Sequence, residues 1–189
     1  MPADESRADL EGLRVVAHPL RLRLLSLLTG ETLSAAEAAR ALGESQANVS
    51  YHLRRLALAG LVELVEEARV RGGTAKRYRH NSRSGESLVP GASGDHRALM
   101  GTMASELTRR AAGYLPQSPL VITDAEVWVP EGDWQRIQDL ARELGAIIHD
   151  AAGPRGGEGR VRIGATLAMF QLAERDAGGQ EPVPPGATP

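Results

Sequence analysis

Hydrophobic side chains recur at helical spacing through residues 20–59, which predicts a run of short helices. The first clear helix is expected over 20–28, where one face carries Leu20, Leu24, Leu27 and Leu28. A shorter helix is expected over 8–17. It is interrupted at His18-Pro19, because proline disfavours helical backbone in the residue before it.

Two further helices are marked by capping residues. Ser34 with Glu37 three residues later has the spacing of a capping box, so we expect a helix over 35–42. Gly43 can end that helix in the left-handed conformation. After a tight turn, a third helix is expected over 45–59, with Ser45 as its N-cap. Its buried stripe comprises Val49, Leu53 and Leu56.

A β-hairpin is expected directly after these helices. Residues 61–66 are rich in Leu and Val and predict a strand, and residues 75–81 predict the returning strand. The paired glycines within 71–74 accept the positive φ angles of a hairpin turn. Residues 82–94, rich in Ser and Gly, read as a linker.

The second half predicts one helix followed by a strand-helix-strand unit. The helix is expected over 95–114, with an apolar stripe of Leu99, Met100, Met103, Leu107 and Ala111. Strands are expected over 120–129 and 160–172, and an amphipathic helix between them over 131–152.

These elements predict an α+β protein. We expect a winged helix-turn-helix domain over 8–82, a dimerisation helix over 95–114, and a small C-terminal β-α-β unit over 119–173 that serves dimerisation or ligand sensing. The tails at 1–7 and 177–189 are expected to be disordered.

The charge changes sign along the chain. Residues 1–83 carry 13 basic and 10 acidic side chains, whereas residues 84–189 carry 9 and 14. Six basic side chains and no acidic one lie within 69–83, around the predicted hairpin turn. A concentration of positive charge in one segment is typical of a phosphate-binding surface.

Composition narrows the class of protein. Cysteine is absent, which excludes disulfides, thiol redox sensing and thiolate metal ligation. No apolar run is long enough to cross a bilayer and no signal peptide opens the sequence, so we expect a cytoplasmic protein without a membrane partner. Arginine outnumbers lysine 21 to 1, which indicates a GC-rich bacterial genome.

Two short helices joined by a tight turn and followed by a hairpin are arranged as in a winged helix-turn-helix domain. Its second helix enters the major groove of DNA, where base edges differ in their donors and acceptors. Gln46, Asn48 and Arg54 can hydrogen-bond to bases, and Ser50, Tyr51, His52 and Arg55 suit phosphates. The predicted recognition helix therefore contacts DNA through Ser45, Gln46, Ala47, Asn48, Ser50, Tyr51, His52, Arg54 and Arg55.

The hairpin would form the wing, laying polar and basic side chains along the neighbouring phosphates. The side chains expected to do so are Arg71, Thr74, Lys76, Arg77 and Arg79. Dimerisation is expected because one recognition helix reads only a few base pairs. The dimer contact is assigned to Leu99, Met103 and Leu107 of the helix at 95–114.

The same residues resemble the ArsR family of bacterial regulators over about 8–82. The resemblance is carried by His18-Pro-Leu-Arg-Leu-Arg-Leu-Leu, by Ser45-Gln-Ala-Asn-Val-Ser-Tyr-His-Leu-Arg-Arg-Leu, by Ala59-Gly-Leu-Val and by the wing Arg71-Gly-Gly-Thr-Ala-Lys-Arg-Tyr-Arg. It implies a homodimeric repressor that binds an inverted repeat in double-stranded DNA and releases it when a signal arrives. A small-molecule effector remains open, as does activation in place of repression.

Two alternatives stay open at this point. The winged domain could be a protein-docking module, since the fold alone does not fix function. The second alternative is a metal-responsive repressor with His and Asp ligands. Against it, the five histidines are scattered along the sequence, and the helix that begins at Asp95-His96 has no second His or acidic pair at a ligand spacing. No catalytic set, phosphate-binding loop or dinucleotide motif is present, so we expect neither an enzyme nor a cofactor.

Overall fold

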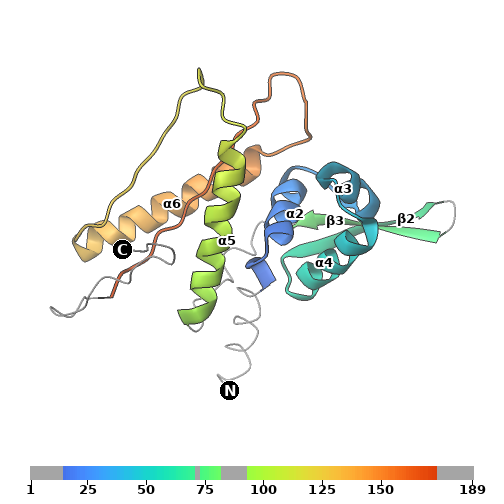
Figure 1. Cartoon of the computed structure of the whole chain (residues 1–189), viewed down its shortest axis with the longest axis horizontal. Helices are drawn as coiled ribbons and strands as arrows, with labels where there is room; N and C mark the ends of the chain where they lie inside the picture. Colours follow the sequence, from blue (N-terminus) through green and yellow to red (C-terminus); the bar gives the residue numbers. More distant parts are fainter. Residues whose placement is uncertain (1–14, 71–72, 82–92, 174–189) are drawn as a thin grey trace, which may run out of the picture.

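The computed structural model describes residues 15–70, 73–81 and 93–173 (Figure 1). The expected tails at 1–7 and 177–189 lie outside these residues, as do the linker residues 82–92 and most of the helix expected over 8–17. No helix in the described part of the chain is long and apolar enough to span a membrane.

Three short helices open the described fold. They are α2 (Pro19–Gly30), α3 (Ala35–Leu42) and α4 (Gln46–Leu58), and all three were predicted from the sequence. The capping box of α3 is confirmed: the Glu37 amide donates to the Ser34 hydroxyl, and the Glu37 carboxylate accepts from the Ser34 amide at 2.7 Å. Gly43 ends α3 with φ 68°, as expected for a left-handed C-cap.

A three-stranded antiparallel sheet follows, in the order β1-β3-β2. The predicted hairpin consists of β2 (Val62–Val70) and β3 (Gly73–His80), both longer toward the turn than expected. The strand β1 (Leu33–Ser34) was not predicted, because two residues are too short to show an alternating pattern. Its pairing with β3 places Ser34 opposite Arg77.

The hydrophobic core lies between α2, α4 and the sheet. Its side chains come from the stripes that the sequence predicted, and the largest fully buried ones are Leu24, Leu28, Val49, Leu53, Leu56 and Leu61. Because Val49, Leu53 and Leu56 lie on one side of α4, the opposite side of that helix faces solvent.

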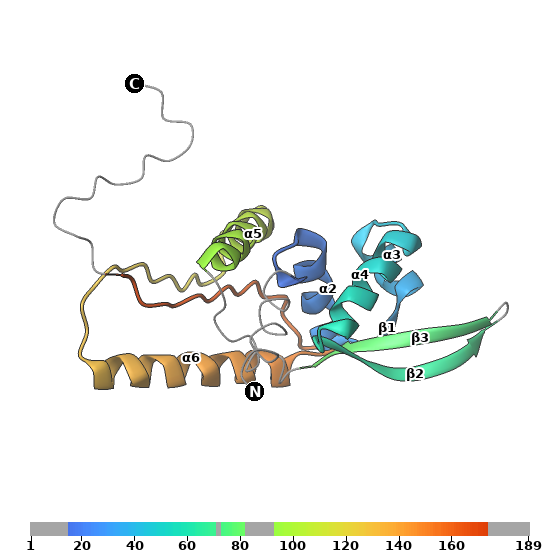
Figure 2. The same cartoon turned by 90° about the horizontal axis from the view of Figure 1, so that it is seen from below.

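The helix α5 (Ser93–Ala111) packs against α2, as Figure 2 shows. Leu99 belongs to the core, and Met100 and Met103 pack against it. Glu106, 4% exposed, pairs with Arg23 of α2 at 3.5 Å and with Arg109 at 2.8 Å. The contact with α2 therefore combines apolar packing with a buried ion pair.

The C-terminal part corrects the sequence prediction. The amphipathic helix is present as α6 (Glu131–Ala151), but the expected strands at 120–129 and 160–172 are not formed. Both segments are extended, and Figures 1 and 2 show them running in the same direction in a layer between α5 and α6. Alternating side chains favour extended chain, whereas a strand also needs a hydrogen-bonded neighbour, and neither segment pairs with the other or with β1–β3. The predicted β-α-β unit is therefore wrong for the single chain.

Candidate nucleic-acid interface

The turn between α3 and α4 fixes the orientation of α4 relative to α3. The amides of Gly43 and Glu44 both donate to the carbonyl oxygen of Ala39, and Ser45 then caps α4 by accepting from the Asn48 amide at 3.2 Å. These local bonds explain why a three-residue connection is enough to join two helices held at a fixed angle.

The outward side of α4 carries most of the predicted contact residues. Tyr51 is 52% exposed and Ser50 is half-buried at the edge. The exposed members of the predicted set are Ser45, Gln46, Ala47, Asn48, Tyr51, Arg54 and Arg55. Apart from the two arginines these side chains are uncharged, so this surface presents hydrogen-bonding groups and two positive charges.

His52 departs from this pattern and corrects the prediction that it faces phosphate. It is 6% exposed, and its ring lies 4.5 Å from the ring of His18 between centroids. The reason is helical spacing: His52 follows the buried Val49 by three residues and so lies on the same side of α4. Burial, then the nearby charges of His18 and Arg21, lower the pKa of His52.

Asn48 is already held in one position by the protein. Its side-chain amide donates to the carboxylate of Glu44 at 3.1 Å, one helical turn before it. A base contact by Asn48 would therefore begin from an ordered side chain, with its carbonyl oxygen still able to accept.

Arg21 of α2, which the sequence did not suggest as a contact residue, is half-buried and lies within electrostatic reach of Arg55 of α4. Burial lowers its pKa, and the charge of Arg55 lowers it further, which places Arg21 and Arg55 within electrostatic reach of each other. Like charges gathered at the edge of an exposed helix favour an anionic partner. The sequence did not indicate that Arg21 lies near Arg55, because the leucine pattern of α2 shows which side of the helix is apolar but not which neighbouring helix a residue contacts.

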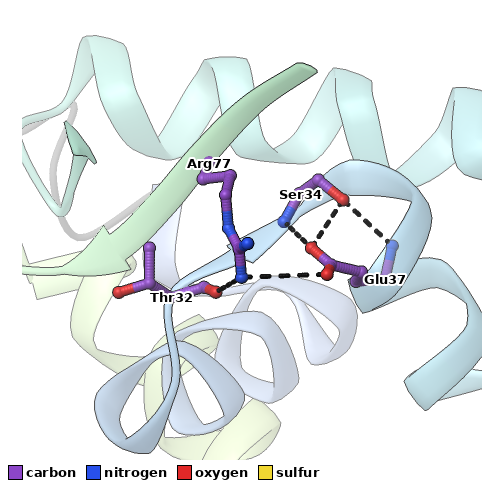
Figure 3. A network of polar contacts seen from close by, with 4 residues as sticks. All are labelled: Thr32, Ser34, Glu37 and Arg77. Carbon is purple, nitrogen blue, oxygen red and sulfur yellow. Dashed lines mark hydrogen bonds and ion pairs between the residues drawn. The ribbon is translucent and has the colours of Figure 1, made fainter. Parts of the chain in front are cut away.

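Arg77 occupies a position inside the domain, which corrects its assignment to the phosphate backbone. Figure 3 shows its guanidinium beside the start of α3. Its Nη2 donates to the Thr32 carbonyl at 2.6 Å and lies 3.7 Å from the Glu37 carboxylate, and its side chain is 34% exposed. The register causes this placement, because Arg77 pairs with Ser34 of β1 and so lies next to the capping box. Arg77 therefore ties the hairpin to α3.

Arg79 has an acidic partner that the sequence pattern did not reveal. It donates to Glu63 of β2 at 2.7 Å, and both side chains are about half exposed. Lys76 is exposed. Arg71 lies outside the described residues, and Thr74 lies on β3 next to the turn. Glu63 thus offsets the positive charge of Arg79.

The predicted dimer contact is only partly available. Leu99 is 8% exposed and part of the core of its own chain, and Met103 packs against that core. Leu107 alone of the three is exposed, at 52%. The core of the same chain therefore covers the first half of the predicted stripe.

The His and Asp side chains do not form a metal site in the described part of the chain. Within residues 15–70, 73–81 and 93–173, no group of three or more His, Cys, Asp or Glu is placed to hold a metal ion. His96 lies at the start of α5. Two histidine pairs have rings close together: His18 with His52, 4.5 Å apart between centroids, and His80 with His149, 5.2 Å apart.

The helices α2, α3 and α4 are followed by the β2–β3 hairpin, and α4, the second helix of the α3–α4 pair, has an exposed side. This arrangement defines a winged helix-turn-helix domain. Domains of this class bind DNA and typically have no enzymatic activity. Residues 16–65 match a family model described as a helix-turn-helix domain, and this part of the chain is an ArsR-like helix-turn-helix domain. The match spans α2 to the start of β2 and so includes the whole of α4. No curated protein matches the chain.

Proposed function

We propose that this protein is a sequence-specific transcriptional regulator, a homodimeric repressor whose α4 enters the major groove at each half of an inverted repeat. The observation that carries the proposal is the division of α4 into a buried stripe and an exposed side of polar residues. A solvent-facing helix of ordinary function more often carries Glu and Lys there, whereas Gln, Asn and Arg are the residues that pair with adenine and guanine.

Within this proposal the residues divide into two groups. Gln46, Asn48 and Arg54 read base edges. The phosphate contacts that flank them come from Ser50, Tyr51, Arg55 and Arg21, with Lys76 on the wing. This set omits His52 and Arg77, because both are engaged inside the domain.

The size of the site supports binding as a dimer. One helix reads only a few base pairs, whereas two helices related by a two-fold axis read two half-sites about one helical turn apart. Release of the DNA would require an input signal. Since the chain has no cysteine, that signal does not act through thiol chemistry.

The test is selection of bound DNA from a random pool, followed by titration of the selected sequence. Arg54→Ala should lose about 1–3 kcal/mol for each base pair it reads, roughly 5- to 150-fold in affinity, and should relax the preference at that position. Arg142→Ala is the matched control, because Arg142 is an exposed arginine on α6 that pairs only with Asp139 among the described residues.

An inverted repeat with about 10 base pairs between half-site centres is the expected selection result. An unchanged preference in Arg54→Ala would contradict the assigned role of α4. Failure to select any sequence, together with a stable complex with another protein, would favour the docking-module alternative.

A further inference from the structure

The largest exposed apolar surface of the described chain lies in its C-terminal part. Of the 22 large hydrophobic side chains that are exposed among the described residues, 15 fall within residues 120–172. They are Leu120, Val121, Ile122, Val127, Trp128, Val129, Leu140, Leu144, Ile147, Val161, Ile163, Leu167, Met169, Phe170 and Leu172. We call this set the C-terminal apolar surface.

Its size exceeds what a monomer normally leaves in water. With roughly 60–120 Å² of apolar area on each such side chain, the set presents on the order of 1,000 Å². The largest apolar patch of a typical monomer is about 300–600 Å². One partner of a stable protein complex buries about 800 Å². The summed apolar area of the C-terminal apolar surface is therefore comparable with the area that one partner of a stable dimer buries.

The two extended segments also lie outside the sheet that the described residues form. Residues 161–173 make no backbone–backbone hydrogen bond with any described residue. Arg110 of α5 donates to two oxygens of the second segment, the Ala165 carbonyl at 2.8 Å and the Thr166 hydroxyl at 3.2 Å. Extended chain outside a sheet, with exposed apolar side chains, can accept a further strand.

We propose that a second copy of this chain covers the C-terminal apolar surface, with the segments 120–129 and 160–172 of the two copies pairing into one intersubunit sheet. The proposal extends the dimer that the proposed function requires, but it does not depend on DNA binding. It also locates the main dimer contact away from Leu99 and Met103, which the subunit's own core occupies.

The direction of the segments favours a second copy over pairing within one chain. Both segments of one subunit run the same way, opposite to α6, and they do not pair (Figure 1). A segment from a two-fold-related copy, laid between them, runs antiparallel to both. The resulting sheet has the order 120–129, partner 160–172, 160–172, partner 120–129. Its outer pairing occurs twice, and its central pairing of 160–172 with the partner's 160–172 lies on the two-fold axis, as two-fold symmetry requires.

The charges favour the same arrangement. The first segment carries Asp124 and Glu126, and the second carries Arg160 and Arg162. Like charges directly opposite each other destabilise a strand pair, and opposite charges stabilise it. The two segments thus carry opposite net charge, which favours placing 120–129 beside the partner's 160–172 over placing it beside a second copy of itself. In the central pair of the proposed sheet, Arg160 and Arg162 lie at one end of each segment, so antiparallel pairing sets them at opposite ends.

The first test is the mass of the purified full-length protein by light scattering, with variants of both candidate contacts. Leu167→Glu, which places a charge in the proposed sheet, should yield a monomer at concentrations where the wild type is a dimer. Leu107→Glu on α5 should remain a dimer, as should the exposed control Arg142→Ala. A monomeric wild type, or dissociation by Leu107→Glu with Leu167→Glu unaffected, would overturn the proposal.

Hydrogen exchange of the wild type avoids any question of whether a variant folds. Amides of 161–172 should be protected in the dimer and should exchange faster on dilution below the dimer's dissociation constant. Exchange at the rate of an unstructured chain in the concentrated protein would refute the sheet. The same measurement separates this proposal from ligand binding within one subunit, which would give protection that does not depend on protein concentration.

Cysteine cross-linking locates the axis. Because the chain has no cysteine of its own, a single introduced cysteine can form a disulfide only between copies. In a scan of Gly164→Cys, Thr166→Cys and Ala168→Cys, the position nearest the axis should cross-link under mild oxidation, since antiparallel neighbours are about 4.5–5.5 Å apart. Ser26→Cys on the exposed side of α2 should not. No cross-link at any of the three would contradict the central pairing of 160–172.

The mass, hydrogen-exchange and cross-linking measurements use the protein without DNA. A concentration-dependent, protected dimer that selects no DNA would leave the intersubunit sheet intact and refute the proposed function. A monomeric protein that binds an inverted repeat would refute the intersubunit sheet and leave the proposed DNA binding intact.

Discussion

Arg77 offers the sharpest prediction, because the sequence and the structure give it different roles. Its position in a basic hairpin predicts a phosphate contact. Its geometry instead joins β3 to the start of α3 through the Thr32 carbonyl and the Glu37 carboxylate (Figure 3). Replacing Arg77 with alanine should therefore lower the stability of the domain, with little specific effect on DNA.

The magnitude follows from the contacts. A hydrogen bond from a charged donor contributes about 1.5–3 kcal/mol, and the 34% exposure of Arg77 favours the lower end. The ion pair with Glu37, at 3.7 Å and equally exposed, adds about 0.5 kcal/mol or less. We expect Arg77→Ala to cost about 2 kcal/mol, or roughly 4–8 °C in melting temperature for a chain of this length.

Arg79→Ala is the matched control, since Arg79 lies two residues away on the same strand. Its only ion-pair partner among the described residues is Glu63, and both side chains are about half exposed, so the pair contributes about 0–1 kcal/mol. Urea unfolding at pH 7 gives the free energies, and the salt dependence of DNA binding gives the number of phosphates contacted. Wild-type stability in Arg77→Ala, together with a salt slope reduced by about one, would refute the structural role.

Two further predictions concern stability. Burial, and then the nearby His149, lower the pKa of His80 to about 4 from 6.5, so the folded state favours the neutral ring. The resulting stability is complete above pH 6.5 and is lost as the pH falls toward 4. Allowing for partial exposure of the ring, the stability difference between wild type and His80→Gln should narrow by about 2 kcal/mol from pH 7 to pH 4.5, measured by urea unfolding; a constant difference would contradict this. Glu106→Ala leaves Arg23 and Arg109 without their buried carboxylate and should cost about 2 kcal/mol, with faster amide exchange in α5; unchanged exchange there would show that α5 docks without the pair.

The helices of the DNA-binding part could be predicted because their signals are local. Ser34, Glu37 and Gly43 mark the ends of α3 by bonds within a few residues, and Ser45 does so for α4. The inward position of His52 was also within reach, since its spacing from Val49 places it on the buried side.

The wing and the C-terminal part depend on partners that are distant in sequence. Which acid meets Arg79 follows from strand register, and Arg77 meets α3 through a two-residue strand that has no pattern of its own. For 120–129 and 160–172 the alternation correctly indicates extended chain, but it does not specify which strand lies alongside.

The most direct test of the account is chemical probing of the major groove on the selected DNA. Guanine N7 lies in that groove, so bound protein should protect guanines from methylation at N7 in both half-sites. Arg54→Ala should remove this protection at one guanine in each half-site, while Arg142→Ala preserves it. Full binding with every guanine N7 still reactive would show that α4 does not lie in the major groove.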